Sequence, residues 1–246
     1  MLFPNIQRRW IFYLWCWDWF LLAILLIYPI SYGILRFLTV ILLFLVWLGA
    51  IVIFWQRLPI KVAGFVVGAI ALLISLLPGQ PINPDILRSY YVQGLIYYEG
   101  TRYVWGGENK FGIDCSGLVR EGLVKANLMY GLRFLNPQTI REGVSIWWYD
   151  SSAVNLKTGY LNKTQVLFAA DSINQIDAAK IQVGDFAVTK DGVHTLAYIG
   201  NNVWIEADPN YQKVIKVQVP EPNNPWFNVP VYLVRWRQLE IPEIPS

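Results

Sequence analysis

The chain contains very few of the residues that bind metal ions or form disulfides. Its 246 residues include one histidine, His194, and two cysteines, Cys16 and Cys115. Protein zinc sites use closely spaced Cys and His ligands, and no such spacing occurs in this sequence. Cys16 lies in an apolar run and Cys115 in a more polar region, so we expect no disulfide between them. The sequence therefore predicts no metal site and implies no cofactor.

Most of the chain also lacks a surplus of basic charge. Residues 1–78 carry five basic residues against one acidic residue, whereas residues 79–246 carry 15 basic against 16 acidic residues. Domains that bind nucleic acid usually present a strongly basic surface. We therefore expect no nucleic-acid partner for the second region.

Apolar residues, in contrast, are abundant at the N-terminal end of the chain. Hydrophobic residues make up 55% of the sequence, more than the roughly 45–50% of an ordinary soluble domain. They concentrate in three segments, at about 11–30, 34–55 and 60–77, and each approaches the ~20 residues that cross a bilayer core. We predict a membrane anchor of about three transmembrane helices over residues 1–78, in contact with the lipid bilayer, and a globular domain over residues 79–246.

Basic residues near the apolar segments predict how the anchor is oriented. Arg8 and Arg9 precede the first segment, and Arg57 and Lys61 lie between the second and the third. With three spans both pairs fall on one side, which the positive-inside rule makes cytoplasmic. The globular domain then faces the periplasm or the cell exterior. Arg36 falls on the other side, close enough to a helix end for its side chain to snorkel towards water.

The first apolar segment is interpreted as a retained membrane helix that contains one cysteine and one acidic residue. No small-residue cleavage site follows this segment, which argues against a removable signal peptide. Cys16 is expected to be an ordinary membrane-helix residue. Asp18 is costly in lipid, and we expect it to lie at the interface or to support helix packing.

The globular region predicts helices first and strands afterwards. Asn83 can cap a helix that runs from Pro84 to about Gly100, and a second helix of about ten residues begins near Cys115. Five segments rich in β-branched and aromatic residues then predict an antiparallel meander, at 184–188, 193–200, 203–208, 213–219 and 231–239. This order is typical of an α+β fold. Residues 130–182 lack clear periodicity and are interpreted as an inserted stretch.

Cys115 has the surroundings of a candidate nucleophile. A helix N-terminus and a nearby histidine both favour the thiolate form of a cysteine. Gly112 and Gly117 flank the residue, so backbone N–H groups can approach an oxyanion closely. A single buried cysteine is structural more often than catalytic, however, and Cys115 alone does not decide between the two roles.

His194 supplies the second part of a candidate site. It lies on a predicted strand, and Glu206 follows it by twelve positions across a turn at residues 200–202. In an antiparallel hairpin the two side chains come within one or two residues of being opposite each other. Glu206 could therefore orient the imidazole, and Asp208, on the same face, is the alternative.

Four short motifs occur in a characteristic order: "YVWGG" (103–107), "DCSGLV" (114–119), "VGD" (183–185) and "HTLAYIG" (194–200). Together they resemble the NlpC-type family of cell-wall cysteine peptidases, over roughly residues 84–240. The resemblance implies a papain-like α+β fold, with a helix that carries Cys packed against a sheet that carries His. It also implies cleavage of peptide bonds in the stem peptides of bacterial peptidoglycan, typically between D-glutamate and a diamino acid.

The resemblance assigns roles to particular residues. Cys115 would be the nucleophile, His194 the general base and Glu206 the third member of the site. Tyr103 would help to stabilise the oxyanion. With the predicted anchor, these roles describe a multi-pass protein of the bacterial inner membrane whose partners are peptidoglycan stem peptides and lipid. Nothing in the sequence identifies a membrane protein partner.

Further positions follow the family less closely. Asp114 and Ser116 would contact substrate, and Trp105 would pack within the fold. Arg102 replaces a proline that is common before the tyrosine, and "LNPQ" (135–138) is a weak form of a familiar element. The long stretch 130–182 is expected to border the cleft.

Two other functions remain compatible with the sequence. One is an amidase or acyltransferase of the same broad fold, although lipid-acting relatives usually place His before Cys in the chain. The other is a catalytically silent wall-binding module, which the presence of a Cys, a His and an acidic residue makes less attractive.

Overall fold

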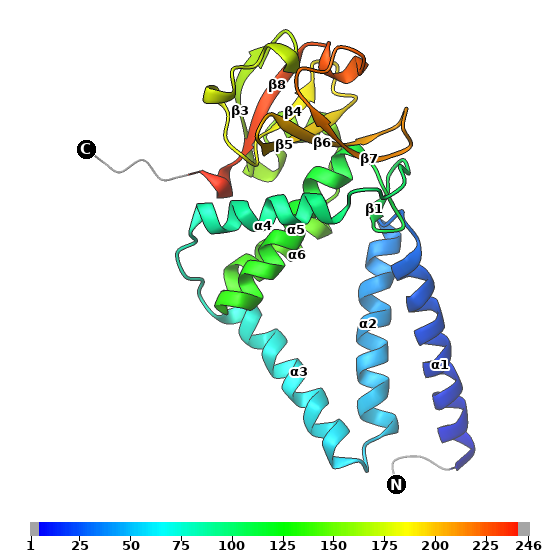
Figure 1. Cartoon of the computed structure of the whole chain (residues 1–246). Coiled ribbons are helices and arrows are strands. Elements are labelled where there is room, and N and C mark those ends of the chain that lie inside the picture. Colours follow the sequence, from blue (N-terminus) through cyan, green and yellow to red (C-terminus); the bar gives the residue numbers. More distant parts are fainter. Residues whose placement is uncertain (1–4, 241–246) are drawn as a thin grey trace.

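The computed structural model describes residues 5–240. The first four residues of the predicted segment 1–78 and the last six of the predicted segment 79–246 lie outside the described residues. Long apolar helices form one end of the molecule, and shorter helices and a six-stranded sheet form the other (Figure 1). The prediction of an α+β fold preceded by three long apolar helices is confirmed.

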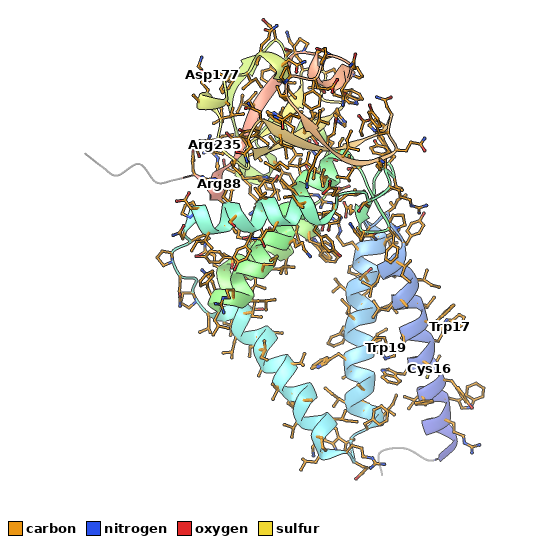
Figure 2. All side chains as sticks on the ribbon, viewed as in Figure 1. Cys16, Trp17, Trp19, Arg88, Asp177 and Arg235 are labelled. Carbon is orange, nitrogen blue, oxygen red and sulfur yellow. The ribbon has the colours of Figure 1, made fainter. Side chains whose placement is uncertain are left out.

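The apolar helices are α1 (Asn5–Ile27), α2 (Ile34–Ile53) and α3 (Leu58–Leu76). Each is long and apolar enough to cross a membrane by length and composition. Helices α1 and α2 lie side by side, whereas α3 diverges from them (Figure 1). Figure 2 shows Cys16, Trp17 and Trp19 along α1, and all three side chains are exposed in the described structure. The start of α1 and the α2–α3 turn lie at the end remote from the sheet (Figure 1).

Helix α4 (Pro84–Tyr97) begins where the sequence predicts it. The Asn83 side chain accepts hydrogen bonds from the backbone N–H groups of Asp85 (3.0 Å) and Ile86 (3.2 Å). These bonds satisfy donors that the first turn of a helix otherwise leaves unpaired. The helix packs across the next one where Gly94 meets Gly122, since a Cβ on Gly94 would lie 2.5 Å from the Gly122 carbonyl oxygen.

Helix α5 (Cys115–Phe134) has 20 residues, twice the length predicted from the sequence. Most of its residues are buried, on all of its faces. A helix buried all round has no single apolar stripe, so its end cannot be read from periodicity. It ends at Leu135, whose backbone is left-handed (φ 49°), and α6 (Pro137–Trp148) follows.

The sheet has the order β3–β8–β4–β5–β6–β7, and every neighbouring pair is antiparallel. The predicted meander is correct for the four consecutive strands β4 to β7 and wrong for β8, which lies between β3 and β4. The partner of β8 comes from the stretch 130–182, where no strand was predicted. The strands are β3 (Thr164–Ala170), β4 (Phe186–Thr189), β5 (Thr195–Gly200), β6 (Val203–Asp208), β7 (Lys213–Gln218) and β8 (Val231–Trp236).

Short elements complete the structure. Residues 130–182 contain the end of α5, α6, the short helix α7 (Ala153–Lys157) and β3, so this stretch is part of the folded domain. A two-stranded ribbon, β1 (Glu108–Asn109) and β2 (Gly112–Ile113), precedes α5. Short 3-10 helices span Tyr160–Asn162, Ile173–Gln175, Ala178–Lys180, Pro225–Phe227 and Arg237–Leu239.

Two groups of buried apolar residues cover the two faces of the sheet. On one face, Leu118 and Leu123 of α5 belong to the same cluster as Phe186 and Trp236 of the strands. The second cluster includes Tyr198, Trp204 and Phe227. Burial of such side chains is the main favourable term in folding. Helix α5 contacts β5 and β6; His194 lies just before β5, not on a strand as predicted, and Glu206 lies on β6.

Arg36 does not snorkel as the sequence suggested. Its side chain is 2% exposed and forms an ion pair with Glu108, which also pairs with Arg120 of α5. Arg36 also donates to the carbonyl oxygen of Trp148 at 2.8 Å. A guanidinium removed from water needs such partners, and the residue therefore joins α2 to the globular domain.

The connection between α1 and α2 packs against the same part of the domain. The Glu108 N–H donates to the Pro29 carbonyl oxygen at 2.9 Å, and Ile30 forms an antiparallel bridge with Gly107. The Asn109 side chain donates to the carbonyl oxygen of Tyr28 at 2.7 Å. The α1–α2 loop, residues 28–33, is thus held by the turn that leads into α5.

Candidate active site

Cys115 is the first residue of α5, and Asp114 caps this helix. One carboxylate oxygen of Asp114 accepts from the Gly117 N–H (2.6 Å) and the Ser116 hydroxyl (3.0 Å), and the other accepts from the Gly106 N–H (2.8 Å). Burial raises the pKa of Asp114, and these three hydrogen bonds act in the opposite direction. The carboxylate therefore joins the glycine-rich turn to the helix that carries the thiol.

Close backbone contacts explain two of the glycines in this region. A Cβ on Gly117 would lie 2.4 Å from the Gly107 carbonyl oxygen, and a Cβ on Gly107 would lie 2.5 Å from the Gly112 carbonyl oxygen. Any larger residue would push the turn away from the helix. The Cys115 N–H lies in the first turn, where amides have no intrahelical partner. Such an amide is the kind of donor that stabilises an oxyanion.

His194 immediately precedes β5 and is almost fully buried. Its Nε2 lies 2.6 Å from Glu206 Oε2 on β6, and Glu206 is fully buried. Ala197 pairs with Ile205 across the two strands, so Glu206 faces a position two residues from His194 and shares its side of the sheet. Because Nε2 is occupied by the carboxylate, Nδ1 is the ring nitrogen left for the thiol.

The thiol and the imidazole interact directly. The Cys115 sulfur lies 3.8 Å from the carbonyl oxygen of Val193. Burial acts to lower the pKa of His194, but hydrogen bonds with Cys115 and Glu206 outweigh it and raise this pKa to about 9. The Trp226 ring stacks on the imidazole, with centroids 4.3 Å apart and an interplanar angle of 22°. The ring is therefore held in place, and its two partners favour transfer of a proton to it.

Asn224 is a residue of this site that sequence reasoning missed. Its Nδ2 donates to Glu206 Oε1 at 2.7 Å and lies 3.4 Å from Asp208 Oδ2. Its Oδ1 accepts from the Trp226 N–H at 3.0 Å. Burial raises the pKa of Glu206, while the hydrogen bonds from His194 and Asn224 act in the opposite direction. The only sequence signal was a turn rich in proline and asparagine at 220–225, which does not distinguish Asn224 from its neighbours.

Asp208, the alternative orienting residue, has a different set of partners. Its Oδ1 accepts from the N–H groups of Asn210 (2.5 Å) and Tyr211 (3.1 Å), which lie in the β6–β7 turn. No hydrogen bond links Asp208 to His194 within residues 5–240. The structure thus brings Glu206, and not Asp208, to the imidazole.

Tyr103 and Cys115 line the same pocket, whose volume is about 420 Å³. Burial and the neighbouring Cys115 and Asp114 raise the pKa of Tyr103, so its hydroxyl keeps the proton that it needs as a hydrogen-bond donor. Trp105 also lines the pocket and is 78% exposed, which shows that the expectation that it packs in the fold was wrong. The remaining walls come from the start of α5, residues 150–153, residues 192–193 and Tyr32 of the α1–α2 loop.

In the described part of the chain, no group of three or more His, Cys, Asp or Glu side chains could hold a metal ion. The site instead contains a thiol at a helix N-terminus, an imidazole in contact with a carboxylate, and a tyrosine that lines the same pocket as the thiol. This set of groups is suited to nucleophilic thiol chemistry. Asp114 and Ser116 also line the pocket, although the Asp114 oxygens already accept hydrogen bonds from the protein itself.

Comparison with known proteins agrees with this class. Residues 100–232 match the sequence model of the NlpC/P60 family, which is more than half of the 246-residue chain. The chain belongs to the NlpC/P60 family. A comparison with curated proteins gives no match.

Several solved structures are similar to this chain. NlpC1 from Trichomonas vaginalis is 18% identical (TM-score 0.41), with 64% of this chain and 46% of that chain covered. The P60 domain of antigen MAP1204 from M. avium subspecies paratuberculosis is 19% identical (TM-score 0.40), with 65% and 100% covered. The peptidoglycan hydrolase RipB from Mycobacterium tuberculosis is 20% identical (TM-score 0.42), with 69% and 72% covered. The chain spans about half the length of NlpC1.

Proposed function

We propose that this protein is a membrane-anchored thiol hydrolase that cleaves peptide bonds in peptidoglycan stem peptides. The observation that carries the proposal is the 2.6 Å contact between His194 and Glu206 beside Cys115 at the start of α5. Membership of the NlpC/P60 family points to the same chemistry. The family resemblance implies the bond between D-glutamate and a diamino acid as the cleavage site.

The reaction begins with transfer of the Cys115 thiol proton to Nδ1 of His194. The thiolate attacks the carbonyl carbon of the peptide bond, and the carbonyl oxygen becomes an oxyanion. The Cys115 N–H and the Tyr103 hydroxyl stabilise this charge. Glu206 stabilises the imidazolium through Nε2, as a carboxylate does for the histidine of other catalytic triads.

The second half of the reaction returns the enzyme to its starting state. The imidazolium gives its proton to the leaving amine, the C–N bond breaks, and a thioester joins the substrate acyl group to Cys115. His194 then takes a proton from water, and the resulting hydroxide attacks the thioester. The thiolate leaves and is reprotonated by His194, so that the products are one amine and one carboxylic acid.

The membrane location is part of the same proposal. Residues 1–78 act as a multi-pass anchor in the bacterial inner membrane, and residues 79–246 form the peptidase domain on the periplasmic or outer side. The basic residues at the start of α1 and around the α2–α3 turn support this orientation. A reporter that is active only after export, fused after residue 80, should be active, whereas a silent reporter would reverse the orientation.

The direct test is hydrolysis of purified muropeptides by the full-length protein in lipid nanodiscs, with mass analysis of the products. We expect two products whose masses sum to that of the substrate plus one water, and none with the Cys115→Ala variant. Turnover by that variant at the wild-type rate would rule out the thiol as nucleophile. If muropeptides stay intact while an alkylating probe labels Cys115, the substrate is another amide and the peptidase assignment is wrong.

A further inference from the structure

The wall of the Cys115 pocket includes a residue from the predicted membrane anchor. Tyr32, in the α1–α2 loop, lines the pocket together with Tyr103 and Trp105. A Cβ placed on Gly106 would lie only 3.6 Å from Tyr32 Cε1, so the tyrosine ring lies directly beside the glycine-rich turn. Without Tyr32 this pocket would lack part of its wall.

The loop is held rigidly against the domain by contacts along its length. Main-chain contacts join Pro29 to Glu108 and Ile30 to Gly107. Arg36, in the first turn of α2, adds an ion pair with Glu108. Both Arg36 and Glu108 are buried. Glu108 also pairs with Arg120, and separating buried charges from their partners has a large cost in free energy. The distance between the loop and the pocket is thus set by the fold.

This junction determines where the pocket lies relative to the bilayer. Residues 28–33 connect the ends of two helices that are long and apolar enough to span a membrane. The connection between two such helices lies at the boundary between hydrocarbon and water. Tyr32 and Trp105 are both largely exposed beside this connection, and exposed Tyr and Trp side chains are favoured at that boundary.

The neighbouring surface has the character expected of a face that rests on lipid. A second pocket, of about 820 Å³, lies between the end of α1 and the domain. It is lined by Ile24 and Ile27 on one side and by Arg102, Lys110 and Glu99 on the other, so two basic residues stand against one acidic residue. Cationic side chains next to an apolar helix end attract the anionic headgroups of a bilayer. Both pockets thus lie beside the ends of α1 and α2 that meet the domain.

From these contacts we infer that the Cys115 pocket opens at the bilayer surface and takes a stem peptide that is still attached to a membrane lipid. The inference rests on the proposed function and specifies its substrate class. A peptide in a distant cell-wall layer would have to approach the membrane to reach the thiol, whereas a lipid-attached peptide is already at the required height. The lipid also confines its peptide to the layer in which the pocket lies.

The distance of the Cys115 pocket from the bilayer surface can be tested by comparing the cleavage rates of peptides on spacers of different length. Stem peptides are attached to a lipid directly or through flexible spacers of about four, eight and twelve residues, each residue adding at most about 3.5 Å of reach. The full-length protein and the peptides share the same vesicles, so every attached peptide has the same local concentration. We expect the directly attached peptide to be cleaved at least as fast as the one with the longest spacer. A rate that rises tenfold or more with spacer length would overturn the inference.

A soluble stem peptide serves as the matched control for the proposed function. Cleavage of the soluble peptide without cleavage of the directly attached one would overturn the inference and leave the hydrolase assignment intact. Cleavage of neither the soluble nor any attached peptide would overturn the proposed function itself, and with it the substrate class inferred here.

The height of the pocket can also be measured without catalysis. A spin label at position 105 (Trp105→Cys, with Cys16→Ser and Cys115→Ser) should be relaxed by a paramagnetic agent bound to lipid headgroups. A label on the native Cys16 should lie in hydrocarbon and one at position 177 (Asp177→Cys) should lie in water, since Figure 2 places Cys16 part-way along α1 and Asp177 at the end of the molecule that holds the sheet. A label at position 105 that behaves like the one at 177 would overturn the inference.

Discussion

Arg36 of the second apolar helix and Glu108 of the glycine-rich turn form a buried ion pair, although 72 positions separate them in the sequence. Arg120 of α5 pairs with the same carboxylate. Burial acts to raise the pKa of Glu108, whereas both arginines act to lower it and favour the charged carboxylate. The predicted anchor and the helix that carries Cys115 are therefore joined through one carboxylate, and the stability of the site depends on both.

Loss of Arg36 should destabilise the whole protein. Arg36→Ala leaves the buried Glu108 with one partner in place of two, and removing one partner of a buried pair typically costs about 3 kcal/mol or more. For a chain of this size the thermal midpoint of the nanodisc-embedded protein should fall by roughly 6–12 °C. Arg57→Ala, which removes an exposed arginine from the α2–α3 turn, is the control and should change the midpoint little.

A second variant of Arg36 separates the ion pair from simple packing. Arg36→Met removes the charge, keeps a side chain of similar length and leaves Glu108 for Arg120. Arg36→Ala removes the packing as well, so Arg36→Met should be the more stable of the two. If Arg36→Ala melts together with Arg57→Ala, the ion pair does not contribute to stability, and the link between the helices and the domain must come from the main-chain contacts.

The stability of the protein should decrease in mildly alkaline solution. The pKa of His194 rises from 6.5 to about 9 in the folded protein. A group whose pKa is higher in the folded state than in the unfolded state stabilises the fold fully at pH values below its unfolded-state pKa. This stabilisation is lost as the pH rises through the folded-state pKa. The free energy of unfolding should thus fall between about pH 6.5 and pH 9, by on the order of 3 kcal/mol.

The Glu206→Gln variant tests the origin of this pH dependence. Replacing the carboxylate removes one of the two groups that stabilise the imidazolium, so the decrease across the same pH range should be smaller. Glu99→Gln changes an exposed carboxylate outside the site and should retain the wild-type pH dependence. If the free energy of unfolding depends on pH in the same way in wild type and Glu206→Gln, His194 titrates independently of Glu206.

Glu206 and Asp208 should differ in their effect on turnover. His194→Ala should reduce kcat for muropeptide hydrolysis by about 10²–10⁴-fold, the usual contribution of a general base. Glu206→Gln should reduce it less, because the base remains but is less well oriented. Asp208→Asn retains an oxygen for the β6–β7 turn and should have little effect. A larger loss in Asp208→Asn than in Glu206→Gln would reverse the two roles.

Asn224 should act as a positioning residue through Glu206. The Asn224→Ala variant removes the donor to Glu206 Oε1, which frees the carboxylate to turn away from His194. We expect a lower kcat with little change in KM, together with a shift of the alkaline limb in the pH profile of Cys115 alkylation. A change in stability alone, with an unaltered alkylation profile, would show that Asn224 serves only the local turn.

Much of the molecule follows from local sequence. The apolar helices are evident from the length of the apolar runs, and the α4 cap at Asn83 follows from side-chain chemistry two or three residues away. The α+β class follows from the order of the periodic segments. His194 and Glu206 could be placed on one face because they lie in a short hairpin, where the alternation of side chains limits the choices.

The tertiary structure alone decided the remaining features. Nothing in the sequence pairs Arg36 with Glu108, brings Tyr32 to the thiol or selects Asn224 as the partner of Glu206. The position of β8 next to β3 was equally hidden, because β3 carries no clear alternation. Local periodicity reports which face of an element is buried, whereas these contacts join elements far apart in the chain, and only the packing of the whole fold determines which of them meet.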